Sequence, residues 1–415
     1  MIASFFVIEA GPGGWNDNSR LATVQALVEQ GTFKIDRTYF FYWTHDKVLV
    51  NGNYYSDKPP LPSLLAAVVY YPLYIAGFRL TPSDSLAHVI IVALTVKLSL
   101  LAGLICFYQS LRHSSLTAEK RLILTAALAV STLILPWSTV LNNHILSAAF
   151  LMIAFYFYLE SRANPSRLSN LIFSGTFFGL SGLSDVPTSI FIALFATLIF
   201  INRRSLKDTM FFLCAPLVLY IIYLTFNFSV SNSIWPPQIN ENFFDYPGSP
   251  WISNHASPSP ESSSGIETKS IKSSVDTGVR YLVGQNGFVL YNPILLIAAP
   301  CLIWTILAKH PLWREASAIS TGTAIIILYY SITTTNAGGG SYSIRWFVPL
   351  LPLLVFFLFG YLQELTKHRL RVLSAVMLIS FAIACIGAVQ PWTKKHIFGS
   401  TSIVANMKVL GEQFD

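Results

Sequence analysis

Long apolar runs separated by short polar stretches dominate the chain after residue 87. None of these runs alternates strictly between apolar and polar positions, so the pattern favours helices over half-buried strands. Most runs approach the roughly 20 residues that cross a bilayer as a helix, and a few are shorter. Inside lipid only helices or closed barrels satisfy the backbone, and barrel strands would alternate. The runs cover residues 88–109, 121–140, 145–160, 169–184, 187–202, 209–228, 292–308, 316–335, 346–363 and 371–390.

The N-terminal stretch MIASFFVIEA is also apolar but too short to cross a bilayer alone. We interpret it as the end of a first transmembrane helix whose start is missing. A cleaved signal peptide is disfavoured because no basic n-region is present. With this helix added, the sequence predicts an all-α polytopic membrane protein of about eleven transmembrane helices, forming a single domain over residues 1–415.

Lysine and arginine gather in alternate loops, and the positive-inside rule places those loops in the cytoplasm. The opposite short loops, 141–144, 185–187 and 336–345, contain only one base, Arg345. The bases of the predicted cytoplasmic loops are Arg112, Lys120, Arg121, Arg162, Arg167, Arg203, Arg204, Lys207, Lys309, Arg314, Lys367, Arg369 and Arg371.

This orientation places the segments 10–87 and 229–291 outside the cytoplasm. The apolar stretch 62–83 is then no full crossing, because counting it as one would move the bases of 112–121 outside. Its internal Pro72 also shortens any helix there. We therefore expect 62–83 to contain a helix that lies at, or dips into, the outer membrane interface.

Composition excludes the soluble globular class. The chain is 53% hydrophobic and 11% charged, with a mean hydropathy of +0.54, whereas soluble domains carry about 25% charged residues. The net charge of +7 is scattered over loops and does not indicate nucleic-acid binding. The four cysteines lie in apolar runs, which favours packing over disulfides or metal ligation. They are Cys106, Cys214, Cys301 and Cys385.

A dense polar segment at 16–61 contrasts with the apolar remainder of the chain. Its motif WNDNSRLA places Asp17 three residues before Arg20, on a helix predicted to start near Asn18 and to end at Gly31. An acid at a helix start is often an N-cap. We prefer a functional interpretation because NGNYYSDKPPL follows at 51–61.

The two motifs together resemble the first outer loop of membrane glycosyltransferases that take a sugar from a polyprenyl phosphate. This group includes the protein O-mannosyltransferase and lipid A aminoarabinose transferase families. Their loop reads approximately D-E-x-R-Y-A and then N-G-x-x-Y-x-E-K-P-P-L. Weaker similarities follow in the same order: LNNH at 141–144, GLSGLSDVPT at 179–188, GQNGFVLYNPILL at 284–296 and GGGSYSIRWFVPLLP at 338–352. The resemblance implies a GT-C fold, a lipid-linked donor and an extracytoplasmic site.

The resemblance also implies residue roles. Asp17 would be the base that takes a proton from the acceptor, and three cations would hold the leaving lipid phosphate. These cations are Arg20, Lys58 and Arg345, and the supporting candidates are Asp57, Asn18, His144 and Tyr55.

The chain departs from the family pattern at several positions. Asn18 replaces a Glu and loses its charge, Leu21 replaces a Tyr, and Asp57 replaces a Glu but keeps the charge. Asp185 stands where relatives carry Lys, so the resemblance gives it no role. We interpret Asp185 and His144, each at an outer helix end, as caps or interfacial residues before catalysts.

The resemblance leads to a specific functional prediction. The protein would be an inverting glycosyltransferase in a cell membrane, most simply the bacterial inner membrane, acting on an envelope lipid, glycan or protein acceptor. Its partners would be the polyprenyl-phosphate-linked sugar, membrane lipids and the acceptor, with no nucleic acid. The outer acids are few and no D-x-D pair occurs, so we predict that no metal or other cofactor is needed.

Two other functions stay open. A transporter or flippase of lipid-linked sugars predicts charges deep in several helices and an internal repeat; the sequence shows mainly Lys97 and no repeat. A noncatalytic scaffold of envelope assembly is the second.

Trp235, Trp251 and Tyr281 either stack on sugar rings or belong to an aromatic membrane belt. The Ser/Pro-rich stretch 257–265 is predicted to be mobile.

The charge pattern makes a topological prediction. Segments 10–87, 229–291 and 391–415 should be extracytoplasmic. A cysteine at Ser263 should therefore react with an impermeant maleimide in intact cells, and one at Ser115 should react only after permeabilisation. Labelling of Ser115→Cys from outside would overturn the orientation.

Overall fold

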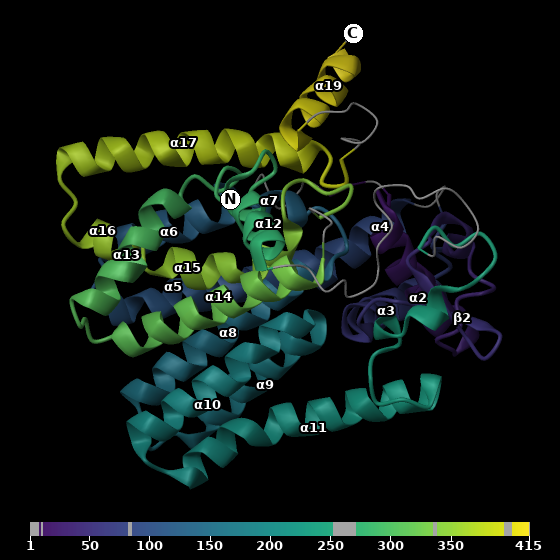
Figure 1. The fold of residues 1–415 in the computed structure, drawn as a ribbon, viewed down its shortest axis with the longest axis horizontal. Helices are drawn as coiled ribbons and strands as arrows, with labels where there is room; N and C mark the ends of the chain where they lie inside the picture. Colours follow the sequence, from purple (N-terminus) through teal and green to yellow (C-terminus); the bar gives the residue numbers. More distant parts are fainter. Residues whose placement is uncertain are drawn as a thin grey trace.

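The computed structural model describes residues 8–9, 11–81, 85–251, 271–334, 338–393 and 401–414. The predicted mobile stretch 257–265 and most of the N-terminal apolar stretch lie outside these residues. The described part is almost entirely helical, with a single two-stranded sheet, and Figure 1 shows its helices laid side by side.

The helices follow the apolar runs of the sequence. Their bounds are α2 (Trp15–Gln30), α3 (Pro60–Ile75), α4 (Ser85–Val92), α5 (Leu98–Ser110), α6 (Ala118–Val130), α7 (Ile134–Trp137), α8 (Asn143–Ala163), α9 (Leu168–Ser184), α10 (Ile190–Arg203), α11 (Leu206–Ser231), α12 (Ile271–Val283), α13 (Leu295–Leu307), α14 (Trp313–Thr333), α15 (Leu351–Phe356), α16 (Phe359–Gln363), α17 (Lys367–Val389) and α19 (Ser402–Phe414). The shorter turns used below are η2 (Ala93–Lys97), η4 (Val186–Ser189), η6 (Glu241–Phe244) and η7 (Arg345–Leu350), and the strands are β1 (Lys47–Val50) and β2 (Asn53–Ser56).

Within the described residues, 7 helical segments are long and apolar enough to cross a membrane. This confirms an all-α polytopic membrane protein, while the number of eleven crossings stays a prediction. Three predicted runs are not among these segments. Two of them form α9, of 17 residues, and α13, of 13 residues. The third is divided between α6 and α7. Helix α3 is apolar and 16 residues long with Pro72 inside it. That length suits the short helix expected in 62–83.

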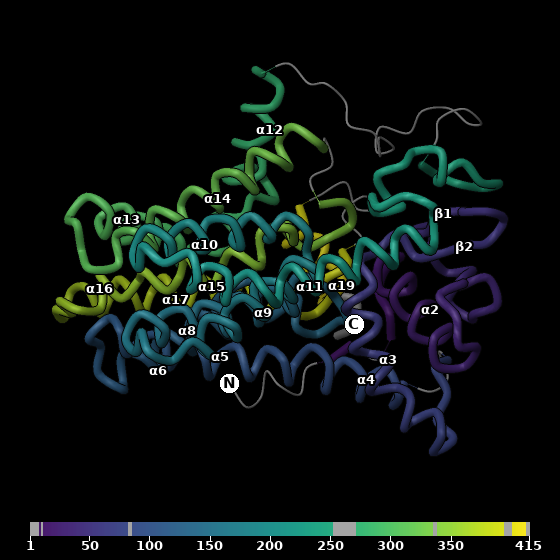
Figure 2. Tube along the Cα trace, turned by 90° about the horizontal axis from the view of Figure 1, so that it is seen from below, coloured from purple at the N-terminus to yellow at the C-terminus, as the bar shows by residue number. Residues whose placement is uncertain are grey.

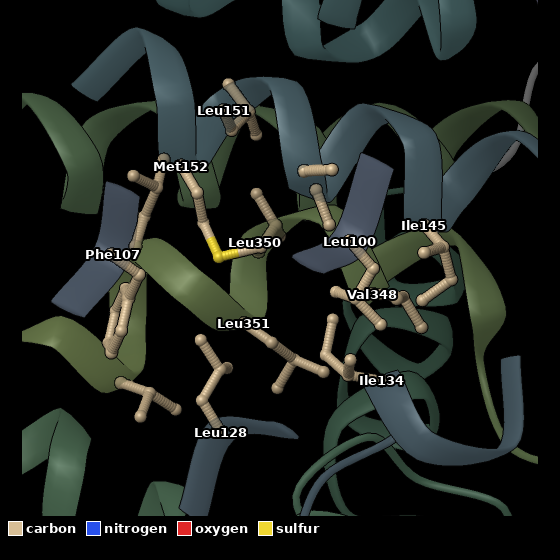
Figure 3. Packing of buried hydrophobic residues seen from close by; sticks show 14 of the residues in the cluster. Leu100, Phe107, Leu128, Ile134, Ile145, Leu151, Met152, Val348, Leu350 and Leu351 are labelled. Carbon is tan, nitrogen blue, oxygen red and sulfur yellow. The ribbon is translucent and has the colours of Figure 1, made fainter. Parts of the chain in front are cut away.

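Helix α8 is the centre of the bundle. In its most apolar window 83% of the residues are buried inside the protein, against 22% for α11 and for α17. Side chains of α5 and of the η7–α15 segment pack against it, as Figure 3 shows for Leu100, Met152 and Leu350. A Cβ on Gly103 of α5 would lie 2.9 Å from the Cα of Ala149, so the two helices meet at backbone distance. Such close contacts replace the hydrophobic driving force that lipid does not supply.

The segment between α2 and α3 forms a small unit of its own. Strands β1 and β2 pair antiparallel with Lys47 opposite Ser56, and Asn51-Gly52 makes the turn with positive φ at both residues, as a two-residue hairpin requires. Phe244 of η6 packs against the hairpin. This contact joins the second outer segment, 229–291, to the first, 10–87.

Two details of α2 bear on the site. The helix starts at Trp15 rather than near Asn18, because its N-cap position is taken by Gly14. Its predicted end is confirmed, since Gly31 has φ 66°, the left-handed conformation that favours glycine at a helix C-terminus.

The predicted cytoplasmic loops meet at one end of the bundle. Arg112 contacts Glu160, Gln363 donates to the Ser114 carbonyl, Arg162 pairs with Glu315, and Arg314 donates to Asn202. The α2–α3 unit lies at the other end in both Figure 1 and Figure 2. The alternation deduced from the basic residues is therefore reproduced by the packing, whereas which end faces the cytoplasm stays a prediction.

Candidate active site

Asp17 lies in the first turn of α2 with its side chain fully buried. Its Oδ2 accepts a hydrogen bond from Nε1 of Trp392 at 2.6 Å, and its Oδ1 is buried with no hydrogen-bond partner among the described residues. Since Gly14 holds the N-cap position, the interpretation of Asp17 as an N-cap is wrong. Glycine is needed in the preceding turn, because a Cβ on Gly13 would lie 2.8 Å from the indole of Trp392.

Burial raises the pKa of Asp17 to about 7, although the charges of Arg20 and Arg345 and the hydrogen bond from Trp392 all lower it. A second acid lies close by. This acid is Glu9, whose Oε2 would lie 3.0 Å from a Cβ on Gly13. A carboxyl group poised near neutral pH can accept and return a proton.

Arg20 lies about one turn further along α2 and is 1% exposed. Its Nη1 donates to the Asn16 carbonyl at 3.2 Å and its Nη2 donates to Oδ1 of Asn143 at 2.7 Å. This second bond connects α2 to the first turn of α8. Burial lowers the pKa of Arg20 to about 10, so the guanidinium keeps its charge at neutral pH.

Arg345 comes from the start of η7 and lies over the ring of Trp392, with 4.9 Å between its Cζ and the ring centroid. Its Nη1 donates to the Gly338 carbonyl at 2.5 Å, while its Nε is buried without a hydrogen-bond partner among the described residues. Trp392 therefore contacts both Asp17 and Arg345, and the structure brings these two sequence-predicted residues together around a tryptophan that the sequence did not single out.

Lys58, a predicted phosphate ligand, is paired with two acids in the structure. Its Nζ is 2.9 Å from Asp46 and 2.8 Å from Asp57, so two carboxylates already neutralise it. Burial raises the pKa of Asp57 to about 6, against the lowering effect of Lys58. Two supporting candidates have local roles: Asn18 Nδ2 donates to the Gly14 carbonyl, and Tyr55 packs at the edge of the hairpin cluster.

A cavity opens beside this group, between the α2–α3 unit and the C-terminal part of α11. Lys58 and Tyr55 line it together with Phe33, Phe226 and Asn227. Its wall combines apolar rings with one cation and a few polar groups.

His144 and Asp185 form a pair that corrects the sequence interpretation. Nδ1 of His144 is 2.6 Å from Oδ2 of Asp185, and both side chains are buried. The cap of α8 is Asn142, whose side chain accepts from the Ile145 N–H. Asp185 does occupy the C-cap position of α9 and the N-cap position of η4, but its side chain makes no capping hydrogen bond. Neither residue is an exposed interfacial group.

The aromatic residues proposed for sugar stacking divide into three cases. Trp251 and Tyr246 donate hydrogen bonds to the same backbone carbonyl, that of His45, at 2.7 and 3.0 Å. Tyr281 is buried, and its hydroxyl donates to the Thr334 carbonyl, so it is a packing residue. Trp235 is exposed.

The remaining expectations concern metal ions and Lys97. In the part of the chain that the structure describes, no three His, Cys, Asp or Glu side chains gather as a metal site; independence from metal stays a prediction. Lys97 ends the π-helical turn η2 and is 1% exposed.

The chain shares its fold with membrane glycosyltransferases of known structure. The apo crystal structure of ArnT from Cupriavidus metallidurans covers 95% of this chain with a TM-score of 0.57 and 15% identity. ArnT bound to undecaprenyl phosphate covers 95%, with a TM-score of 0.57 and 14% identity. The apo oligosaccharyltransferase from Archaeoglobus fulgidus covers 94%, with a TM-score of 0.54 and 12% identity.

The likeness confirms the GT-C fold that the motifs implied. The chain spans 64% and 65% of the two ArnT chains and 54% of the oligosaccharyltransferase. No protein-family model and no curated protein matches the sequence. The protein is therefore a polytopic membrane protein with the fold of glycosyltransferases that include ArnT, a lipid A aminoarabinose transferase.

The buried Asp17 makes a prediction about stability. Its pKa lies near 7 in the folded protein and near the ordinary 3.8 when unfolded, so its contribution to stability is greatest below pH 4 and is lost as the pH rises through 7. Asp17→Asn removes this loss and keeps an acceptor for Trp392. We expect the variant to melt at a higher temperature than wild type. Its free energy of unfolding should rise by on the order of a few kcal/mol, and the rise should be larger at pH 8 than at pH 5.

The measurement is thermal unfolding in detergent at both pH values. Asp245→Asn, at an exposed position, is the control and should melt like wild type. If Asp17→Asn is less stable than wild type at pH 8, an ionised Asp17 instead holds the fold together.

Proposed function

We propose that this protein is an integral membrane glycosyltransferase that moves a sugar from a polyprenyl-phosphate donor to an envelope lipid, glycan or protein at the extracytoplasmic face. The observation that carries the proposal is the buried carboxyl of Asp17, whose pKa is about 7, near two guanidinium groups. Burying such a group costs free energy, and sites that bear this cost are commonly functional.

The groups have complementary tasks in the transfer. Ionised Asp17 takes the proton of the acceptor hydroxyl or amine, which then bonds to the anomeric carbon on the side opposite the phosphate. The bond between that carbon and the phosphate oxygen breaks, and its electron pair stays on the phosphate. Arg20 and Arg345 stabilise this growing negative charge by charge-assisted hydrogen bonds. The configuration of the sugar is inverted.

The donor phosphate would lie beside Lys58. The cavity between the α2–α3 unit and α11 is lined by Lys58, Tyr55 and apolar rings. Lys58 is bridged by Asp46 and Asp57, so an entering phosphate competes with these carboxylates for its ammonium group. Protonation of Asp57, whose pKa is raised to about 6, eases this exchange.

The glycosyltransferase and the two alternative functions, a flippase and a noncatalytic scaffold, predict different outcomes of one experiment. A flippase moves the lipid-linked sugar without changing its bonds, and a scaffold leaves the lipid-linked pool unchanged. Mass spectrometry of envelope glycans and lipids, from cells with and without the protein, distinguishes the three. Deleting a transferase leaves an acceptor species that lacks one sugar and a raised level of the donor.

The first functional prediction concerns Asp17. Asp17→Asn should lower transfer by on the order of a hundred- to ten-thousand-fold, since a positioned base contributes that much, without loss of folded protein. The assay is restoration of the modified envelope species in a deletion strain, with Asp245→Asn as the matched control. Full restoration by Asp17→Asn would make Asp17 structural and refute the mechanism.

The second concerns donor binding. Arg makes bidentate contacts with phosphate whereas Lys acts as a point charge. Arg345→Lys should therefore raise the donor KM about tenfold, and Arg345→Ala and Lys58→Ala should raise it further. The measurement is transfer rate against donor concentration in nanodiscs. If both residues only anchor helices at the interface, Arg345→Lys will behave as wild type. An unchanged donor dependence in all three variants would leave the phosphate to Arg20.

A further inference from the structure

The buried pair of His144 and Asp185 has no part in the transfer as described so far. His144 is the second residue of α8, and Asp185 directly follows α9. Their side chains are 6% and 5% exposed. Ionisable groups buried in a membrane bundle are expensive to hold there and usually serve a function.

The short contact decides which ring nitrogen carries the exchangeable proton. At 2.6 Å from Asp185, Nδ1 of His144 donates its hydrogen to the carboxylate. The amide nitrogen of Asn143 lies 3.5 Å from the same Nδ1, too far to compete with the contact to Asp185. Nε2 makes no hydrogen bond to any residue that the structure describes. It is therefore the atom that binds and releases a proton, in the tautomer that Asp185 fixes.

The backbone around the pair is held by a cluster of hydroxyl groups. Ser147 and Ser181 lie 2.7 Å apart across the α8–α9 interface, and Thr188 lies 2.9 Å from Ser181. Thr188 also donates to the carbonyl of Asp185 at 2.8 Å. These bonds fix the end of α9 against α8, so the carboxylate is placed by a rigid support rather than by a loop.

The pair adjoins the two arginines of the proposed site. Asn143, the neighbour of His144, accepts the 2.7 Å hydrogen bond from Arg20. The turn η7, which begins with Arg345, packs against α8, and the charge of Asp185 acts on Arg345. The charges of Arg20 and Arg345 also act on His144. An imidazole and two guanidinium groups near one another are the group types expected to bind a phosphate.

We infer that His144 is a further catalytic residue, which donates the proton of its Nε2 to the lipid phosphate as it leaves, and that Asp185 is the positioning residue that holds the imidazole. This rests on the proposed function. When the bond from the anomeric carbon to the phosphate oxygen breaks, the phosphate keeps the electron pair and takes the Nε2 proton. Asp17 takes the acceptor proton. His144 then regains a proton from water and Asp17 releases one, so the cycle balances.

The first test needs no turnover. Protein labelled with ¹⁵N-histidine in nanodiscs is titrated with undecaprenyl phosphate, and the His144 signal is assigned by its loss in His144→Gln. We expect its Nε2 resonance to move on titration in wild type and to move less in Asp185→Asn. His113 is an internal control, because it contacts a carboxylate, Glu160, at the opposite end of the bundle, and its signal should not move. A stationary His144 resonance at saturating lipid phosphate overturns the inference.

The second test is kinetic. His144→Gln and Asp185→Asn should lower kcat by on the order of a hundredfold or more with little change in the donor KM. The wild-type rate should fall as the pH rises through the range in which His144 loses its proton, and this basic limb should disappear in His144→Gln. His113→Gln should behave as wild type. A His144→Gln enzyme with wild-type kcat and the same basic limb overturns the inference while the proposed transferase stands. If wild type transfers no sugar, the transferase itself is wrong, whatever the resonance does.

Discussion

The burial of the Asp17 carboxyl is the constraint on which the arrangement of the site depends. Its hydrogen bond with Trp392 joins residues 375 positions apart in the chain, so the first described helix and the segment after α17 must meet at one end of the bundle. The two glycines before α2 allow the indole to approach, and Arg345 lies over the same ring. A carboxyl that is expensive to bury thus fixes how three remote parts of the chain come together.

The two ends of the bundle treat their charges differently. At the basic end, Arg112 and Arg369 are partly exposed and form ion pairs that water screens, so each contributes little to stability. At the other end, Asp17 and Arg20 are buried and only partly satisfied by hydrogen bonds. The exposed pairs of Arg112 and Arg369 can therefore serve orientation in the membrane, while Asp17 and Arg20 keep unused hydrogen-bonding capacity that a substrate can use.

The sequence was a reliable guide to features set by local pattern. The apolar runs predicted the helices, Gly31 predicted the end of α2, and the motif spacing placed Asp17 beside Arg20. What it missed depends on distant contacts. Trp392 is one of nine tryptophans and carries no local signal, and the partner of His144 lies 41 residues away on another helix. The pairing of Lys58 with Asp46 was also missed, because it needs the β1–β2 hairpin, which no apolar run predicts.

The attachment of the second outer segment has a consequence for how such a protein diversifies. Trp251 and Tyr246 both bind the backbone carbonyl of His45 rather than its side chain. A carbonyl is present whatever amino acid occupies the position. A change of residue 45 during evolution would therefore keep these two hydrogen bonds, and would alter only the packing of its ring on Trp15. Changes of the side chain at residue 45 are in this way separated from the two hydrogen bonds that hold the second outer segment.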